Sequence, residues 1–118
     1  MKKQLLALTA LALFATGNVF AGDVYGDNYT PYTIEATIHT ASGGWLVTTI
    51  KPNQRNFDIG DYNRGYSGVS FKVIDGPSAG RTAWVSNPAG SGNINGVTID
   101  ESERYGQKVV QVNGTVVS

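Results

Sequence analysis

The sequence contains no cysteine, a single histidine and few charged residues, which make up 15% of its 118 residues. Without cysteine the chain has no disulfide framework and no thiol nucleophile. Structural zinc sites use several cysteine or histidine ligands, so one histidine argues against such a site as well. No motif indicates a cofactor. A small domain without these elements depends on its hydrophobic core for stability.

Long hydrophobic runs are also scarce. After residue 21 no apolar stretch approaches the ~20 residues that a membrane-spanning helix needs, so no membrane span is expected. Before that point, two lysines precede an apolar stretch from Leu5 to Ala15, and Val19 to Ala21 forms a small-x-small cleavage site. This order is typical of a bacterial export signal. We predict that residues 1–21 are a signal peptide and that residues 22–118 form one domain, periplasmic or secreted.

Basic residues do not exceed acidic ones. The chain has 9 Lys and Arg against 9 Asp and Glu, and removal of the two signal-peptide lysines leaves a formal net charge of −2. Nucleic-acid-binding domains normally present a basic face. We therefore expect no nucleic-acid partner and consider a protein, a peptide or a cell-envelope polymer instead.

Short runs of alternating apolar and polar residues replace helical periodicity throughout the predicted domain. The alternation is clear from Tyr32 to His39 and from Gly68 to Ile74. A Gly-Pro turn separates the second run from a predicted return strand, Arg81 to Ser86, as a hairpin closed by a four-residue loop with a bulge. Asn113-Gly114 indicates another hairpin. These patterns predict an all-β fold, either a small barrel or a compact antiparallel β-sandwich of about six short strands.

Two segments are predicted to be irregular. Pro52 to Ser67 lacks periodicity and is rich in Asn, Asp and Gly, so we expect a long loop there. A connection of this length in a small domain is more often functional than not. Ile94 to Asp100 is expected to be a weak strand, and Glu101 to Gly106 a polar turn.

The hairpin from Gly68 to Val85, GVSFKVIDGPSAGRTAWV, resembles the central hairpin of SH3-like small barrels, which include bacterial SH3 modules and KOW-type hairpins. In that family a strand leads into Gly-Pro-x-x-Gly and the return strand ends in Trp-Val. The resemblance covers 18 residues and departs at Ala83, where bacterial SH3 modules usually have glycine. It implies an SH3-like barrel and non-catalytic binding, commonly of peptides or cell-wall fragments.

Aromatic residues give the main functional indication. Tyr62 and Tyr66 lie in the predicted Pro52 to Ser67 loop, with Arg64 between them. Amphipathic rings in a polar loop suit a partly hydrated binding surface, and arginine adds a charged donor. We predict that Tyr62, Arg64, Tyr66 and Trp84 form one ligand-binding patch. The alternative is that one tyrosine ring folds inward and anchors the loop.

Catalytic chemistry is weakly indicated. His39 is the only histidine, and its spacing suggests no partner for a Ser-His-Asp triad. Glycoside hydrolysis needs two carboxyl groups that face one cleft. The candidate groups are Asp58 with Asp61, and Asp100 with Glu101 and Glu103. Because these residues lie in predicted turns, solvated surface positions explain them better, and the protein is not expected to be an enzyme.

Calcium binding stays open from the sequence. Asp58, Asp61 and Asn63 cluster with glycines in the predicted loop, and calcium takes oxygen ligands from flexible loops. Their spacing differs from that of the helical calcium loop, and turn formation explains the same residues without a metal.

These observations predict a small exported binding module for a peptide or a cell-envelope polymer. Two alternatives remain. One is an enzyme inhibitor or immunity-type protein that inserts the Pro52 to Ser67 loop into a cleft. The other is a small carboxylate-based hydrolase, for which the sequence offers the least support.

Overall fold

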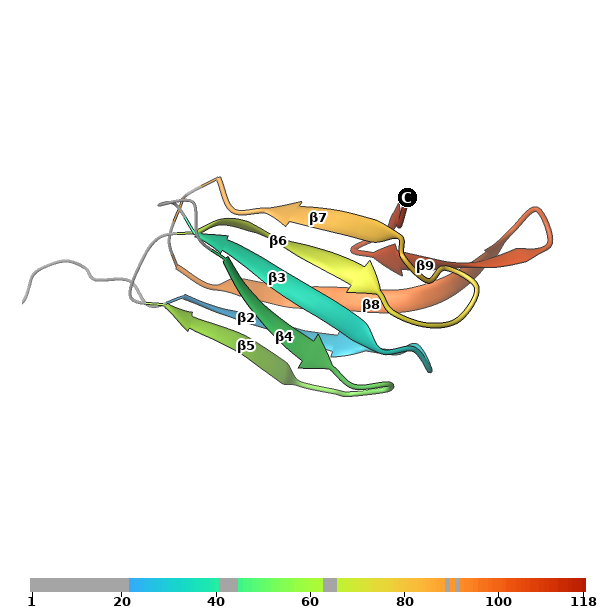
Figure 1. Cartoon of the computed structure of the whole chain (residues 1–118), viewed down its shortest axis with the longest axis horizontal. Helices are drawn as coiled ribbons and strands as arrows, with labels where there is room; N and C mark the ends of the chain where they lie inside the picture. The colour runs from blue at the N-terminus through green and yellow to red at the C-terminus, as the bar shows by residue number, and fades with distance from the viewer. Residues whose placement is uncertain (1–21, 41–44, 63–65, 89, 91) are drawn as a thin grey trace, which may run out of the picture.

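Two facing β-sheets make up the part of the chain that the computed structural model describes, residues 22–40, 45–62, 66–88, 90 and 92–118 (Figure 1). The strands are β2 (Gly22–Asn28), β3 (Ile34–Thr40), β4 (Trp45–Ile50), β5 (Phe57–Tyr62), β6 (Tyr66–Val73), β7 (Thr82–Ser86), β8 (Ile94–Arg104), β9 (Gln107–Val112) and β10 (Thr115–Val116). The described residues contain no helix, which confirms the all-β prediction.

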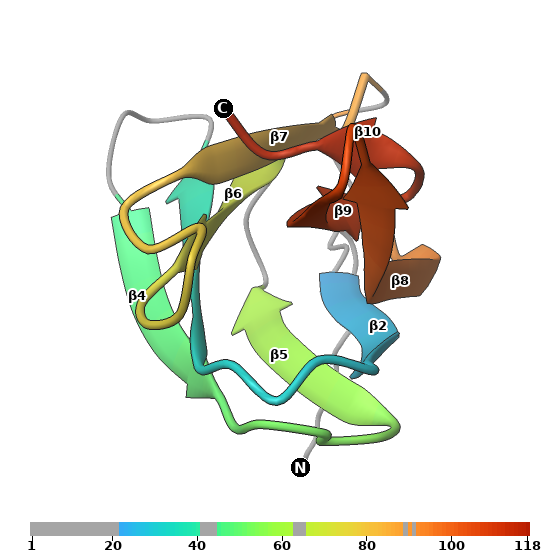
Figure 2. The same cartoon turned by 90° about the vertical axis from the view of Figure 1, so that its right-hand side faces the viewer.

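The strand order is β10-β9-β8-β2-β5 in one sheet and β4-β3-β6-β7 in the other. Figure 2 shows the two sheets facing each other around the core. This arrangement corresponds to the sandwich alternative of the prediction. It differs from that prediction in having nine described strands instead of about six, and in pairing β2 parallel to β8.

The core lies between the sheets and follows the alternation seen in the sequence. Strand β3 buries Ile34, Ala36 and Ile38, each at most 1% exposed. In β6, Val69 and Phe71 lie directly opposite Ile38 and Ala36 and are equally buried. Each large apolar side chain buried in this way contributes about 1.5–3 kcal/mol relative to an exposed one.

Both locally encoded hairpins form, and one of them has a longer loop than predicted. Strands β6 and β7 pair antiparallel, and Pro77 occupies the first central position of a turn closed by a hydrogen bond from Ala79 N to Gly76 O of 3.2 Å. The connecting loop is longer than the four predicted residues. The backbone hydrogen bonds that close it join Val73 to Gly80 and Arg81. Strands β9 and β10 pair across Asn113-Gly114, whose φ angles of 50° and 82° suit a type I′ turn.

Within the described residues, the two segments predicted to be irregular are so only in part, at residues 52–56 and 105–106. Residues 57–62 of the expected Pro52 to Ser67 loop form strand β5, and β6 already begins at Tyr66. The expected turn over Glu101 to Gly106 is instead the end of β8, which continues to Arg104. The β8–β9 hairpin turns only at Tyr105 and Gly106, and it extends beyond the other strands (Figure 1).

Strand β2 was not predicted, and a glycine makes it possible. A side-chain carbon built at Gly26 lies 2.3 Å from the Val97 carbonyl oxygen and 2.6 Å from the Phe57 ring. Real atoms do not approach so closely, so only glycine lets β2 run between β5 and β8 at this point. Gly26 therefore determines how closely three strands of the larger sheet pack.

A buried asparagine connects three segments of the chain. Asn28, at the end of β2, is fully buried. Its amide nitrogen donates to the carbonyl oxygens of Tyr32 and Lys51, both at 3.0 Å. Its amide oxygen accepts from the backbone and hydroxyl of Thr30 at 3.0 and 2.7 Å. All hydrogen-bonding capacity of the Asn28 amide group is used, as a buried polar group requires.

The last residues close one side of the sandwich. Val117 is 2% exposed, so its side chain belongs to the core. Its backbone N–H donates a hydrogen bond to the carbonyl oxygen of Val110 in β9. Ser118 exchanges two backbone hydrogen bonds with Thr82 of β7, at 3.1 and 2.9 Å. Figure 2 shows the chain end running from β10 along β7. The two sheets are therefore joined by backbone bonds along this side.

Candidate functional site

The outer face of the four-stranded sheet carries the candidate site. Because Ile34, Ala36 and Ile38 point to the core, the odd-numbered residues of β3 point outward, and the register extends this alternation to the neighbouring strands. His39 lies opposite Trp45 of β4 and opposite Gly68 of β6.

Trp84 is held in place on this face. A side-chain carbon built at Gly68 lies 2.4 Å from the Trp84 ring, so the ring occupies the space that a side chain of β6 would fill. The His39 ring meets the Trp84 ring edge to face, with centroids 5.1 Å apart. Trp84 nevertheless remains 49% exposed. Its indole is therefore fixed by its neighbours while one part of it faces solvent.

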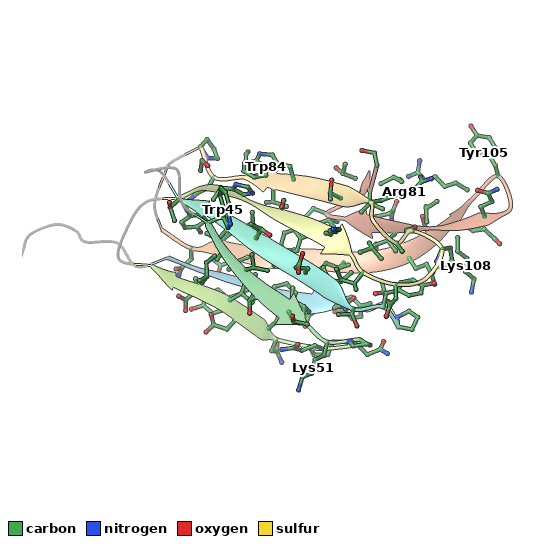
Figure 3. All side chains as sticks on the ribbon, viewed as in Figure 1. Trp45, Lys51, Arg81, Trp84, Tyr105 and Lys108 are labelled. Carbon is green, nitrogen blue, oxygen red and sulfur yellow. The ribbon has the colours of Figure 1, made fainter. Side chains whose placement is uncertain are left out.

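Trp45 and Val47 extend the same surface along β4. Trp45 is 68% exposed, and Val47 is 49% exposed. Figure 3 shows Trp45 and Trp84 at the same end of the sheet. Single exposed apolar residues are common, but contiguous ones mark binding surfaces. We call His39, Trp45, Val47 and Trp84 the tryptophan face.

Tyr66 corrects the predicted binding patch. Its side chain is fully buried, and its hydroxyl donates to the Gly92 carbonyl oxygen at 2.8 Å. Asn87 bonds the Tyr66 carbonyl oxygen, so the residue is anchored at both ends. The expectation of an exposed Tyr66 ring is wrong. A β-bulge between β3 and β6 pairs Thr40 with Tyr66, so Tyr66 leaves the outward alternation of Gly68 and Ser70 and its ring is buried. The inward-folding alternative describes Tyr66 correctly.

The other predicted site residues have different outcomes. Trp84 lies on the face opposite the buried Ala83, as predicted. The backbone of Tyr62 belongs to β5 and pairs with Gly22, but its side chain and Arg64 lie outside the described residues. Sequence reasoning missed Trp45 and treated His39 as an isolated surface residue. Alternation in β3 places His39 outward, but its pairing with Trp45 and its contact with Trp84 depend on strand register.

The carboxylates do not gather at one cleft in the described part of the chain. Asp100 and Glu101 are neighbours on β8 and point to opposite faces of the sheet. Asp100 accepts a hydrogen bond from Gln111 at 3.1 Å, and Glu101 accepts one from the Tyr32 hydroxyl. Glu103 lies opposite Lys108 in the hairpin.

The predicted calcium ligands are only partly described. Asp58 is an exposed residue of strand β5 instead of a loop residue, whereas Asn63 and the side chain of Asp61 lie outside the described residues. Within the described ranges, no group of three or more potential metal-ligating side chains is present. Nor does that part of the chain contain a helix with the length and apolarity to cross a membrane.

Two surface cavities lie away from the tryptophan face. One of about 320 Å³ is bordered by Pro77, Arg81, Lys108 and Val109, between the β6–β7 loop and β9. A second of about 270 Å³ lies beside Tyr25, Asp27 and Phe57 on the five-stranded sheet. Neither of these two cavities includes a residue of the tryptophan face.

Two tyrosines have raised pKa values. The hydrogen bond that Tyr32 donates to the Glu101 carboxylate raises the pKa of its hydroxyl above 10.0, because ionisation would remove the shared proton. Burial raises the pKa of Tyr66, and the negative charge of Asp23 adds to this effect. Both tyrosines therefore keep their protons longer in the folded state than in the unfolded chain.

We expect the fold to lose stability above pH 10. The unfolded chain ionises its tyrosines near the ordinary pKa of 10.0, whereas Tyr32 and Tyr66 ionise later in the folded state. The stabilising effect of both groups is complete below pH 10 and is lost as the pH rises through the folded-state pKa values. Urea unfolding across this range measures it. Tyr32→Phe should flatten the decline, and an unchanged slope would contradict the role of the Glu101 bond.

No family model, no curated protein and no solved structure matches this chain. The resemblance of residues 68–85 to the hairpin of SH3-like barrels therefore stays a prediction.

Proposed function

We propose that this protein is an exported, non-catalytic binding module whose tryptophan face binds a glycan polymer of the cell envelope. The observation that carries this proposal is a pair of tryptophans on one sheet face: Trp84 is half-exposed and Trp45 is exposed. An exposed indole has no role in the core, and Trp84 is fixed by Gly68 and His39 before any ligand arrives. Such preorganisation reduces the entropy lost on binding.

The chemistry of the face suits a sugar chain. A pyranose ring presents an apolar surface of C–H groups and a rim of hydroxyl groups, so it can stack on an indole while its hydroxyls remain solvated or hydrogen-bonded. Val47 and Trp84 lie in one row of the sheet, with Thr37 and Ser70 between them. The hydroxyl groups of Thr37 and Ser70 can donate and accept hydrogen bonds beside the aromatic rings. The exposed indoles lie on the two edge strands of the sheet, β4 and β7, and this spacing also suits a polymer that extends across the face.

Replacing either tryptophan by alanine is expected to weaken glycan binding about tenfold or more, since aromatic anchors in such surfaces contribute about 1–3 kcal/mol each. Binding would be measured by co-sedimentation with insoluble peptidoglycan and by titration with soluble glucans. Trp45 is 68% exposed, so its variant should unfold thermally like wild type, whereas the Trp84 variant should lose some stability because its ring packs on Gly68 and His39.

Tyr105→Ala is the matched control, because Tyr105 is fully exposed at the opposite end of the molecule (Figure 3). It should leave glycan binding unchanged. A wild-type protein that binds none of these glycans, or tryptophan variants that bind like wild type, would refute the proposal.

One observation favours the inhibitor alternative. Tyr105 projects from the tip of the β8–β9 hairpin, with a φ of 52° that glycine or asparagine adopts more readily. Strained, exposed residues are often retained for function. If the protein is an inhibitor, this hairpin is the segment that would enter a cleft, in place of the predicted Pro52 to Ser67 loop. Recovery of one stoichiometric protein partner from an envelope extract, lost in Tyr105→Ala, would support this alternative.

A further inference from the structure

Strand β4 is an exposed sheet edge with unusual composition. It is the last strand in the order β4-β3-β6-β7, so its outer edge has no strand partner among the described residues. Its sequence, WLVTTI, contains no charged residue and no proline. Three consecutive side chains, Trp45, Leu46 and Val47, are 46–68% exposed. Exposed apolar edges of this kind readily accept a further strand.

The other sheet edges carry features that discourage pairing. Strand β7, TAWVS, is uncharged like β4, but its edge is covered at Thr82, which exchanges backbone hydrogen bonds with Ser118. Strand β5 presents the exposed carboxylate of Asp58. Strand β10 has only two residues. Charges, coverage and short length are the usual means by which sheet edges avoid further partners. The six residues of β4 show none of them.

Leu46 adds a second indication at this edge. It lies opposite the buried Ile38 and thus on the core side of the sheet, yet it is 46% exposed. The core is therefore incompletely covered where β4 forms the border. An additional strand beside β4 would cover part of this side chain.

We propose that β4 pairs antiparallel with β4 of a second copy, joining two four-stranded sheets into one of eight strands. The uncharged strand meets an identical strand without like-charge repulsion, and a two-fold axis closes the assembly at two copies. Pairing centred on Val47 places Trp45 of one copy opposite Thr49 of the other. Lys51, the first charged residue after β4, lies outside the central paired segment.

The symmetry of this pairing has a consequence for the tryptophan face. Antiparallel pairing of identical strands requires a two-fold axis perpendicular to the sheet, so residues that face outward in one copy face the same way in the other. Both tryptophan faces would lie on one side of the eight-stranded sheet. The dimer itself does not depend on the proposed glycan ligand.

The test is the association state of the purified protein. Because a single strand edge is a small interface, we expect a dimer dissociation constant on the order of 100 µM by sedimentation equilibrium. Val47→Lys adds a charge next to its symmetry copy and should weaken dimerisation at least tenfold. Thr49→Lys, also exposed on β4, provides a second variant in case the first is misfolded. Ser86→Lys, on the opposite edge strand β7, should leave dimerisation unchanged.

Hydrogen exchange measured at several protein concentrations would locate the interface between the two copies. Amides of β4 should exchange more slowly as concentration rises into the dimer range, whereas those of β7 should not change. A wild-type protein that is monomeric at ~1 mM, a dimer that protects another strand, or an open-ended series of larger assemblies would overturn the proposal. These outcomes are independent of glycan binding, so the two proposals can fail separately.

Discussion

Replacing Asn28 by aspartate is expected to destabilise the protein by about 3–5 kcal/mol, because the change leaves buried carbonyl groups without donors and buries a charge. The Asn28 amide nitrogen donates to the carbonyl oxygens of Tyr32 and Lys51. A carboxylate oxygen in the same place would repel both. The shape of the side chain hardly changes, so the loss would come from hydrogen bonding and charge. Urea unfolding at neutral pH measures it.

Asn113→Asp is the matched control for this prediction. Asn113 is exposed, and its side-chain oxygen accepts from the Thr98 backbone at 2.8 Å, which a carboxylate also does. The same chemical change should therefore alter stability by less than about 0.5 kcal/mol there. If both variants lose similar amounts, the Asn28 amide donors do not hold the three segments together.

The second large effect is expected at Gly26. Gly26→Ala should destabilise the fold by about 3 kcal/mol or more, because the added carbon meets the Val97 carbonyl oxygen, which cannot rotate away as a side chain can. Relief requires β2 and β8 to separate, and both strands contribute to the core. Thermal and urea unfolding would record the loss.

Gly96→Ala separates this steric effect from backbone strain. Gly96 has a φ of +72° and no neighbouring atom within 4 Å of the added carbon, so only the unfavourable dihedral angle contributes. The expected loss is about 1–2 kcal/mol. A Gly26 variant as stable as the Gly96 variant would show that β2 and β8 can move apart easily.

The parts of the fold that could be predicted are those encoded locally. Alternation in β3 and β6 reflects one buried face, and Pro77 and the Asn113-Gly114 pair specify turns through their own backbone preferences. Strand β5 could not be recognised in the sequence because Asp58, a residue typical of loops, occupies its exposed position. Its alternation is visible at Phe57 and Ile59, which are both buried.

Long-range pairing explains the rest. Strand β2 has glycines at both Gly22 and Gly26, which are rare in strands, and it forms because β5 and β8 flank it. In the candidate site, alternation alone predicts an outward Trp84. The meeting of Trp84 with His39 depends on Gly68, which becomes significant only once the register across three strands is known.

The position of β2 also determines when this protein can fold. Its partners are β5 and the parallel β8, and its last pair joins Asn28 to Ile99. Contacts between residues so far apart in sequence form slowly, because the entropy cost of closing a large loop comes before any stabilising contact forms. On the ribosome, the five-stranded sheet cannot be completed until Val116 of β10 has been synthesised. Under the export proposed above, the larger sheet would still be unformed until late in synthesis, and an incompletely folded chain is what passage through a narrow secretion channel requires.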